Sequence, residues 1–151
     1  MVMERSIRTF KLRVSNEGFD LLARCHHRLM TATRTLIPYG ATLTVAMEWL
    51  DRERPRPPLA IERTKISGLC GPITLFVGAP RWISSKALEF SNLLEKPEVW
   101  GARVSIGEVY LLALYGLSRI SSADLVVLAS QITDEQDGGV KKPNVELGAS
   151  E

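Results

Sequence analysis

The chain contains little cysteine, little histidine and no long apolar run. Its 151 residues include 2 cysteines and 2 histidines, and hydrophobic residues make up 45%. No stretch of about 18 or more apolar residues occurs, and the N-terminus lacks the apolar core of a signal peptide, so we expect neither a membrane span nor secretion. The two cysteines form no CxxC motif, which argues against a disulfide scaffold and favours a reducing cytoplasm.

Patterns typical of metal sites and of enzymes are also scarce. Cys25-His26-His27 suggests a metal, but adjacent side chains on a helix diverge and no further histidine completes a zinc set. His26 is better interpreted as a core or boundary residue. A hydrolytic cluster would have to come from Tyr110, Tyr115, Ser121, Ser122 and Asp124. Since no nucleophile motif such as GxSxG occurs, we predict no catalysis, no metal and no cofactor.

Charge is distributed unevenly along the chain, although the net charge is only +2. Residues 1–65 contain 12 Lys+Arg against 7 Asp+Glu, whereas residues 66–135 contain 5 against 7. A basic N-terminal half beside a mildly acidic one indicates a localised anionic partner. Chance clustering of surface charge is the alternative.

One pattern recurs after 63 residues. The segment from Thr9 to Val14 alternates polar and apolar residues, which predicts a strand, from about Ser6 to Val14, with one buried face. Its apolar positions and their counterparts 63 residues later are Phe10, Leu12 and Val14, then Ile73, Leu75 and Val77. The second strand is predicted over Ile73–Val77. The chain therefore contains one unit twice.

In the first unit two helical patterns follow the strand. The first helix is predicted from Glu17 to Thr33 with Ser15 or Asn16 as its N-cap. Its expected buried face is Phe19, Leu22, Ala23, His26 and Met30. Pro38-Tyr39-Gly40 then breaks the chain, and a second helix is predicted from Thr42 to Arg54. The buried stripe expected on this helix is Leu43, Ala46, Met47 and Leu50.

The second unit repeats this order. Gly78-Ala79 is expected to end the strand, and Pro80 suits the first turn of the next helix. The buried face expected on that helix is Ile83, Ala87, Phe90 and Leu94. Ser105 and Glu108 form a capping box before a further helix, in which Ile106, Val109, Tyr110 and Ala113 repeat the earlier stripe.

The remaining segments connect or extend the two units. Residues 1–54 form the first unit and residues 55–72 a linker, in which Leu59 to Ile66 could add a short strand. Residues 73–133 form the second unit, including an extra helix from Ser122 to Ile132. Residues 134–151 have the composition of a solvated, disordered tail. A single strand with two helices cannot cover its own edges and apolar stripes, so the two units should share one compact domain.

Three segments of the chain resemble a known family. They are the strand Thr9–Val14, the helix start at Ser15-Asn16 and the segment Gly40-Ala41-Thr42. The pattern resembles the ribbon-helix-helix DNA-binding proteins of the Arc and MetJ type, whose β-ribbon reads DNA. Two copies in one chain are similar to the tandem variants, the TraY and VirC-type accessory proteins of DNA transfer. The resemblance implies a mostly helical α+β fold. A two-stranded antiparallel ribbon would lie over four helices as a pseudo-dimer, with one additional C-terminal helix.

The resemblance also implies which residues would contact DNA. Outward strand residues would read base edges in the major groove: Thr9, Lys11 and Arg13 from the first strand, and Thr74 and Phe76 from the second. The N-termini of the second helices would bind phosphates. The candidate phosphate-binding positions are Ala41 and Thr42, Ser105 and Ile106, and the side chains of Arg5, Arg8 and Arg34.

The second strand departs from this pattern because Pro72, Thr74 and Phe76 replace Thr9, Lys11 and Arg13. Either the chain reads an asymmetric site, mainly through its first strand, or the second half has become scaffold or partner surface. Trp49, Trp82 and Trp100 could stack on bases, although Trp82 coincides with Phe19 in the repeat, which favours core packing.

The expected function is sequence-specific binding of double-stranded DNA. The setting would be a DNA-transfer accessory factor, or a transcriptional or partition regulator. The chain would act as a monomeric pseudo-dimer or a higher homo-oligomer on DNA. A relaxase or another protein could bind its last helix. A protein-interaction or dimerisation module that uses the same fold without DNA is the rival interpretation.

Overall fold

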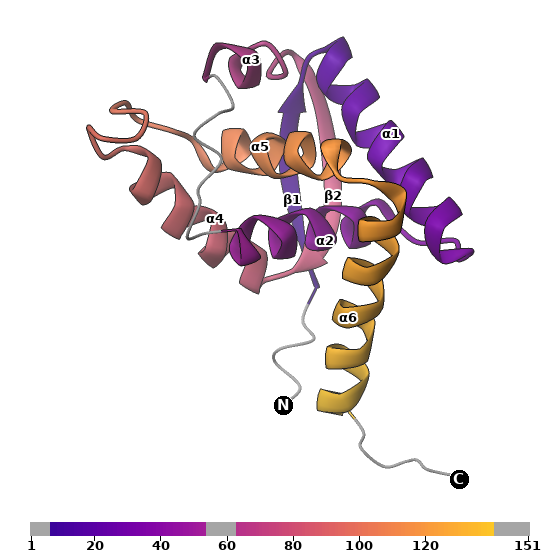
Figure 1. Ribbon diagram of the computed structural model, residues 1–151. Helices are drawn as coiled ribbons and strands as arrows, with labels where there is room; N and C mark the ends of the chain where they lie inside the picture. The colour runs from indigo at the N-terminus through magenta and orange to yellow at the C-terminus, as the bar shows by residue number, and fades with distance from the viewer. Residues whose placement is uncertain (1–6, 54–62, 141–151) are drawn as a thin grey trace, which may run out of the picture.

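A computed structural model describes residues 7–53 and 63–140 of the chain (Figure 1). The elements in chain order are β1 (Ile7–Val14), α1 (Asn16–Thr33), α2 (Tyr39–Arg52), α3 (Arg63–Ser67), β2 (Ile73–Pro80), α4 (Trp82–Leu94), α5 (Ile106–Arg119) and α6 (Ser122–Val140). The predicted fold is confirmed: the protein is a mostly helical α+β pseudo-dimer in which each strand is followed by helices, in the tandem ribbon-helix-helix arrangement.

β1 and β2 pair antiparallel into a two-stranded ribbon. Leu12 lies opposite Leu75, and Phe10 lies opposite Val77. Along β1 the residues alternate between buried and exposed from Phe10 to Val14, as a strand with one covered face requires. Figure 1 shows α2 and α5 crossing the same side of the two strands, so the helices cover the apolar face and leave the other face uncovered.

The predicted start of α1 is confirmed, and its predicted buried face is partly wrong. The Ser15 hydroxyl accepts a hydrogen bond from the Gly18 N–H at 3.1 Å, which caps the helix. The residues that α1 buries are Gly18, Leu21, Leu22, Cys25 and Leu29. Phe19 is 45% exposed because this stripe, about one residue away from the predicted one, faces the core. Of the predicted face only Leu22 is fully buried.

α2 begins at Tyr39, so the prediction that Thr42 opens this helix is wrong. Pro38 occupies the N-cap with an extended backbone, and Thr42 lies inside the helix, fully buried. The reason is a close approach between α2 and β2. A Cβ on Gly40 would overlap the Gly78 carbonyl oxygen, so a residue without a side chain is required there. The predicted stripe from Leu43 to Leu50 is buried throughout.

β2 continues through Gly78 and Ala79 to Pro80, three residues beyond the predicted end. Ala79 is buried, and Pro80 lies opposite Ile7 at the end of the ribbon, where a residue without an N–H is tolerated. Pro80 is therefore not in the first turn of α4, which begins at Trp82. The predicted buried face of α4, from Ile83 to Leu94, is confirmed.

Two predictions about the connecting segments are wrong. Arg63–Ser67 forms the short helix α3, not the end of a strand, while 59–62 lie outside the described residues. The Leu69 carbonyl accepts from the Ser15 N–H at 2.9 Å, which fixes the segment after α3 to the start of α1. The last helix, α6, continues to Val140, past the predicted end at Ile132 and into the segment expected to be a tail.

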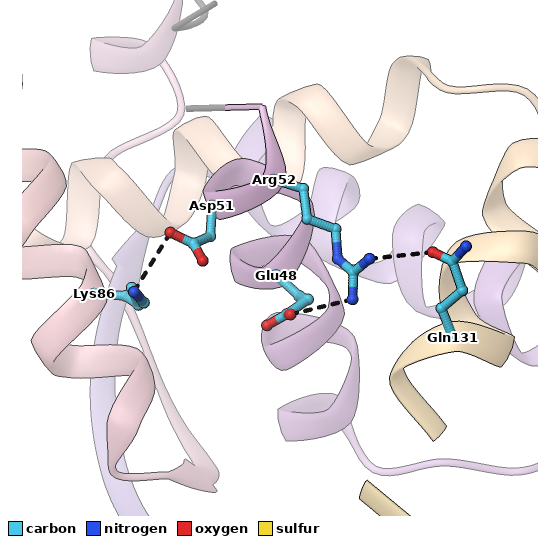
Figure 2. A network of polar contacts seen from close by, with 5 residues as sticks. All are labelled: Glu48, Asp51, Arg52, Lys86 and Gln131. Carbon is cyan, nitrogen blue, oxygen red and sulfur yellow. Dashed lines mark hydrogen bonds and ion pairs between the residues drawn. The ribbon is translucent and has the colours of Figure 1, made fainter. Parts of the chain in front are cut away.

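A single hydrophobic core joins both units. α2 packs on α5, with the Trp49 ring directly over Gly116, where a Cβ would collide with it. At the rim of this core Arg52 contacts Glu48 at 3.4 Å and Gln131 of α6 at 3.2 Å, while Lys86 of α4 contacts Asp51 at 3.5 Å (Figure 2). These polar contacts hold α2 between α4 and α6.

Candidate nucleic-acid interface

The uncovered face of the ribbon carries the residues predicted to read bases. Thr9, Lys11 and Arg13 of β1 are exposed on it, as are Thr74 and Phe76 of β2. Each β1 residue has a cross-strand neighbour from the same face: Thr9 lies opposite Gly78, Lys11 opposite Phe76, and Arg13 opposite Thr74. No acidic residue occurs among these positions, so the described part of this face is basic and partly apolar.

The start of β1 and the end of β2 extend this face beyond the predicted positions. Ile7 is 66% exposed and lies opposite Pro80, and its side chain would contact a Cβ placed on Gly78. Ile7 and Gly78 were not among the predicted outward positions, because the alternation was followed only from Thr9 and the second strand was predicted to end at Val77. The alternation could have revealed Ile7, since it lies two residues before Thr9.

The N-terminus of α2 lies near β2, and the N-terminus of α5 lies near β1. Gly40 of α2 approaches Gly78 of β2, and Gly107 of α5 lies near the Leu12 side chain of β1. A helix N-terminus attracts anions through its free N–H groups and its dipole. Both helix starts therefore lie against the ribbon, and phosphate binding by them stays a prediction.

The two helix starts differ in the donors that they offer. In α2 the cap, Pro38, has no N–H, and the Ala41 N–H already bonds to the Pro38 carbonyl at 3.0 Å. Thr42 is buried, and its hydroxyl finds no partner in the described part of the chain. Thr42 therefore lies behind the first helical residues, Tyr39 and Gly40, and its role in phosphate binding stays a prediction.

In α5 the chain itself occupies part of the predicted anion position. The Ser105 N–H donates to the Glu108 carboxylate at 2.9 Å, and the Glu108 N–H donates to the Ser105 hydroxyl at 3.1 Å. The predicted capping box is confirmed. Its carboxylate also places a negative charge where a phosphate was predicted to bind, and it opposes that binding. Ile106 is exposed beside it.

The predicted arginines lie in different surroundings. Arg5 is outside the described residues. Arg8 is exposed, and its guanidinium carbon lies 5.5 Å from the centre of the Phe10 ring, so its charged end lies on the same side of β1 as Phe10, at the edge of the covered face. Arg34 is the left-handed C-cap of α1 and is exposed there. Arg8 is therefore the predicted cation that the described structure places directly at the ribbon.

A shallow pocket of about 340 Å³ lies between β1, α4 and α5. Arg8 and Lys11 line one part of it, and Ser85 and Gly107 line another. The Tyr110 ring forms its wall, and burial raises the pKa of the Tyr110 hydroxyl to about 12 although the Arg8 charge opposes this shift. Tyr110 therefore stays neutral near pH 7 and adds no negative charge to this basic surface.

The residues behind the rival interpretations serve the fold. Cys25 is buried and donates to the Leu114 carbonyl, and a ring nitrogen of His26 lies 2.7 Å from the Ile37 carbonyl. Ser121 caps α6, its hydroxyl accepting from the Asp124 N–H. All three tryptophans are partly buried against the core. Over residues 7–53 and 63–140 no three His, Cys, Asp or Glu side chains come together as metal ligands.

The chain matches no family model, no curated protein and no solved structure. None of the helices in the described part of the chain combines the length and apolar character needed to cross a bilayer. The candidate interface therefore rests on the geometry of the ribbon and on the chemistry of the residues that it exposes.

Proposed function

We propose that this protein binds double-stranded DNA in a sequence-specific manner, with the uncovered face of the ribbon in the major groove and without catalysis. The observation that carries the proposal is the exposure of Lys11 and Arg13 on the face that no described helix covers. The major groove, about 12 Å wide, admits a two-stranded ribbon, and Arg and Lys suit the O6 and N7 acceptors of guanine.

The surroundings of the ribbon support contact with the DNA backbone. The charged end of Arg8 lies beside β1 at the edge of the covered face, and the starts of α2 and α5 lie near β2 and β1 respectively. Phosphate contacts of this kind orient a protein on the duplex, and base contacts then specify the sequence. The acidic Glu108 at α5 makes the two sides of the ribbon unequal in this respect.

The tandem arrangement favours a DNA-transfer accessory factor over a transcriptional or partition regulator, by analogy of fold. In that setting α6 offers a surface for a relaxase, another protein or a second copy of the chain. Val126 and Val127 are exposed on α6, while Leu125, Leu128 and Ala129 are buried on its other side.

A protein-interaction module is the second candidate, because Ile7 and Phe76 are exposed apolar residues on the same face of the ribbon. The two candidates differ in their response to salt. If about six phosphates are neutralised, the logarithm of the DNA association constant should fall with a slope near −5 against the logarithm of salt concentration. An apolar protein interface would barely respond.

The direct test uses a duplex recovered by selection from random DNA and measures affinity by fluorescence anisotropy. The double variant Lys11→Ala/Arg13→Ala should lose at least about 100-fold in affinity for that duplex, because two base contacts are removed. Its circular dichroism should be unchanged, since both side chains face solvent.

The matched control is Arg24→Ala/Lys96→Ala, which removes two exposed cations from outside the ribbon. It should retain most of the specific affinity. Equal affinities of the ribbon variant and the wild-type protein would remove the ribbon from the mechanism.

A further inference from the structure

The pairing of β1 with β2 and the 63-residue repeat share one centre. The repeat relates Leu12 to Leu75, and these two residues are also direct cross-strand neighbours. The repeat also relates the pairs on either side of this one. It maps Phe10 to Ile73 and Val14 to Val77, and the cross-strand pair Phe10–Val77 thereby corresponds to the pair Ile73–Val14. A pseudo-twofold axis therefore passes between Leu12 and Leu75, and β1 runs past it on one side.

Because β1 runs past the axis at Leu12, its two central basic residues lie toward opposite ends of the ribbon. Arg13 and its neighbour Thr74 lie on one side, and Lys11 and its neighbour Phe76 lie on the other. The repeat relates Arg13 to Phe76 and Lys11 to Thr74. The two sides of the ribbon thus each contain one cation, but they present different chemistry to a duplex.

Each side suits a different base-pair pattern. Arg13 can donate two hydrogen bonds to guanine O6 and N7, with the Thr74 hydroxyl beside it. On the other side Lys11 can donate to guanine as a point charge, while Phe76, which is 71% exposed, suits the methyl group of thymine. Lys11 and Arg13 are about 7 Å apart along the strand, which equals about two base-pair steps.

We propose that one chain reads a duplex site with two unlike halves, a guanine-reading half at Arg13/Thr74 and a thymine-requiring half at Lys11/Phe76. This inference rests on the proposed function. In this arrangement β1 and β2 read each half of the site together, so the asymmetry does not come from one strand reading one half.

The first experiment compares the wild-type protein with a variant whose ribbon face is symmetric. Thr74→Lys/Phe76→Arg gives both strands the same outward sequence at the related positions, and both residues are exposed, so folding should be retained. Binding-site selection from random duplex DNA should recover an asymmetric motif for the wild-type protein and an inverted repeat for the variant.

The second experiment tests the thymine contact, first on the wild-type protein and then on two single variants. Replacing thymine by uracil removes one methyl group, and in the Lys11/Phe76 half this should weaken binding about fourfold, the value of one buried methyl group. The same replacement in the other half should have no effect. Phe76→Ala should abolish the difference between thymine and uracil, while Arg13→Ala should leave it intact.

The outcomes separate the two proposals. Absence of any specific duplex for the wild-type protein would overturn the proposed function and this inference with it. Specific binding to an inverted repeat by the wild-type protein would overturn this inference alone. An asymmetric motif that stays unchanged in Thr74→Lys/Phe76→Arg, or uracil effects that are independent of Phe76, would also overturn it while leaving DNA binding in place.

Discussion

The outer helices of the two units differ in length and in their neighbours. α1 runs from Asn16 to Thr33 and packs against α6, whereas α4 is shorter, from Trp82 to Leu94. α6 packs mainly on α1 and α2. The difference is visible at one related position. Cys25 of α1 is buried, while Leu88, 63 residues later on α4, is 52% exposed. The reason is a shift in the repeat: α4 begins at Trp82, three residues later than the 63-residue repeat of Asn16 would give, so positions 63 residues apart do not face the core alike on the two outer helices.

The inner helices behave differently from the outer ones. α2 and α5 pack on each other, and related positions such as Ala46 and Val109, or Met47 and Tyr110, are buried in both. Each unit supplies the covering surface for the other, so the packing constrains both copies together. On the uncovered face of the ribbon no such constraint acts, and there the basic residues of β1 face Thr74 and Phe76 of β2.

The largest effect should come from the central pair of the ribbon. Leu12 is fully buried and Leu75 only partly, although the repeat relates them. Leu12→Ala should lower the free energy of unfolding by about 3 to 4 kcal/mol, and Leu75→Ala by about half as much, because less apolar surface and a smaller cavity are involved. Urea unfolding measures both. Equal losses would show that the two strands are protected alike.

A smaller effect should separate two related polar residues of the outer helices. Arg28 of α1 donates to the Ser118 carbonyl at 3.1 Å, in the last turn of α5, and to the carbonyl of its C-cap Ile120 at 2.8 Å. Ser91 of α4, 63 residues later in the sequence, donates to the Val104 carbonyl just before α5. Arg28→Ala should cost about 2 kcal/mol of unfolding free energy and Ser91→Ala about 1 kcal/mol, since hydrogen bonds from charged groups contribute more.

The control for this comparison is Arg28→Lys, which keeps the charge. A lysine presents a single ammonium group instead of a planar fork, so it cannot reproduce both contacts and should recover only part of the loss. Thermal unfolding of the three variants measures the order. Full recovery by lysine would mean that charge, and not the two carbonyl contacts, holds the corner between α5 and α6.

The smallest effect should appear at the two helix starts beside the ribbon. Glu108 places a carboxylate at the start of α5, and α2 has no acidic residue in its first turn. Glu108→Gln retains an acceptor for the Ser105 N–H but removes the charge. DNA affinity should rise about two- to fivefold, the size of a single charge at a helix end.

The matched control is Glu98→Gln, which removes an exposed carboxylate of the second unit that lies outside the capping box. Fluorescence anisotropy at low salt measures both variants on the same duplex. Equal gains in the two would indicate a change in overall charge and not a local effect at α5.

The local patterns of the sequence predict much of this fold. Alternation identified both strands, and apolar spacing identified the buried faces of α2 and α4, because these signals lie within a few neighbouring residues. The capping box at Ser105 and Glu108 is equally local. The exposed positions of Lys11, Arg13, Thr74 and Phe76 followed from the same alternation.

The features that the sequence failed to predict depend on contacts between distant segments. The start of α2 is determined by the approach of Gly40 to Gly78, which no local pattern reveals. The buried face of α1 was misplaced because Phe19 is apolar and yet faces outward. At the candidate interface, the capping box correctly predicted that the Glu108 carboxylate lies at the start of α5. The prediction of a phosphate at the same place did not take this negative charge into account.

Both strands of the ribbon belong to one polypeptide, and this has a consequence for assembly. When two separate chains must meet to complete such a sheet, dilution shifts the equilibrium toward dissociation and unfolding. Here closure is intramolecular and carries no mass-action term. The midpoint of unfolding should accordingly be the same at nanomolar and micromolar protein, and the ribbon should stay intact at concentrations too low for dimers to persist.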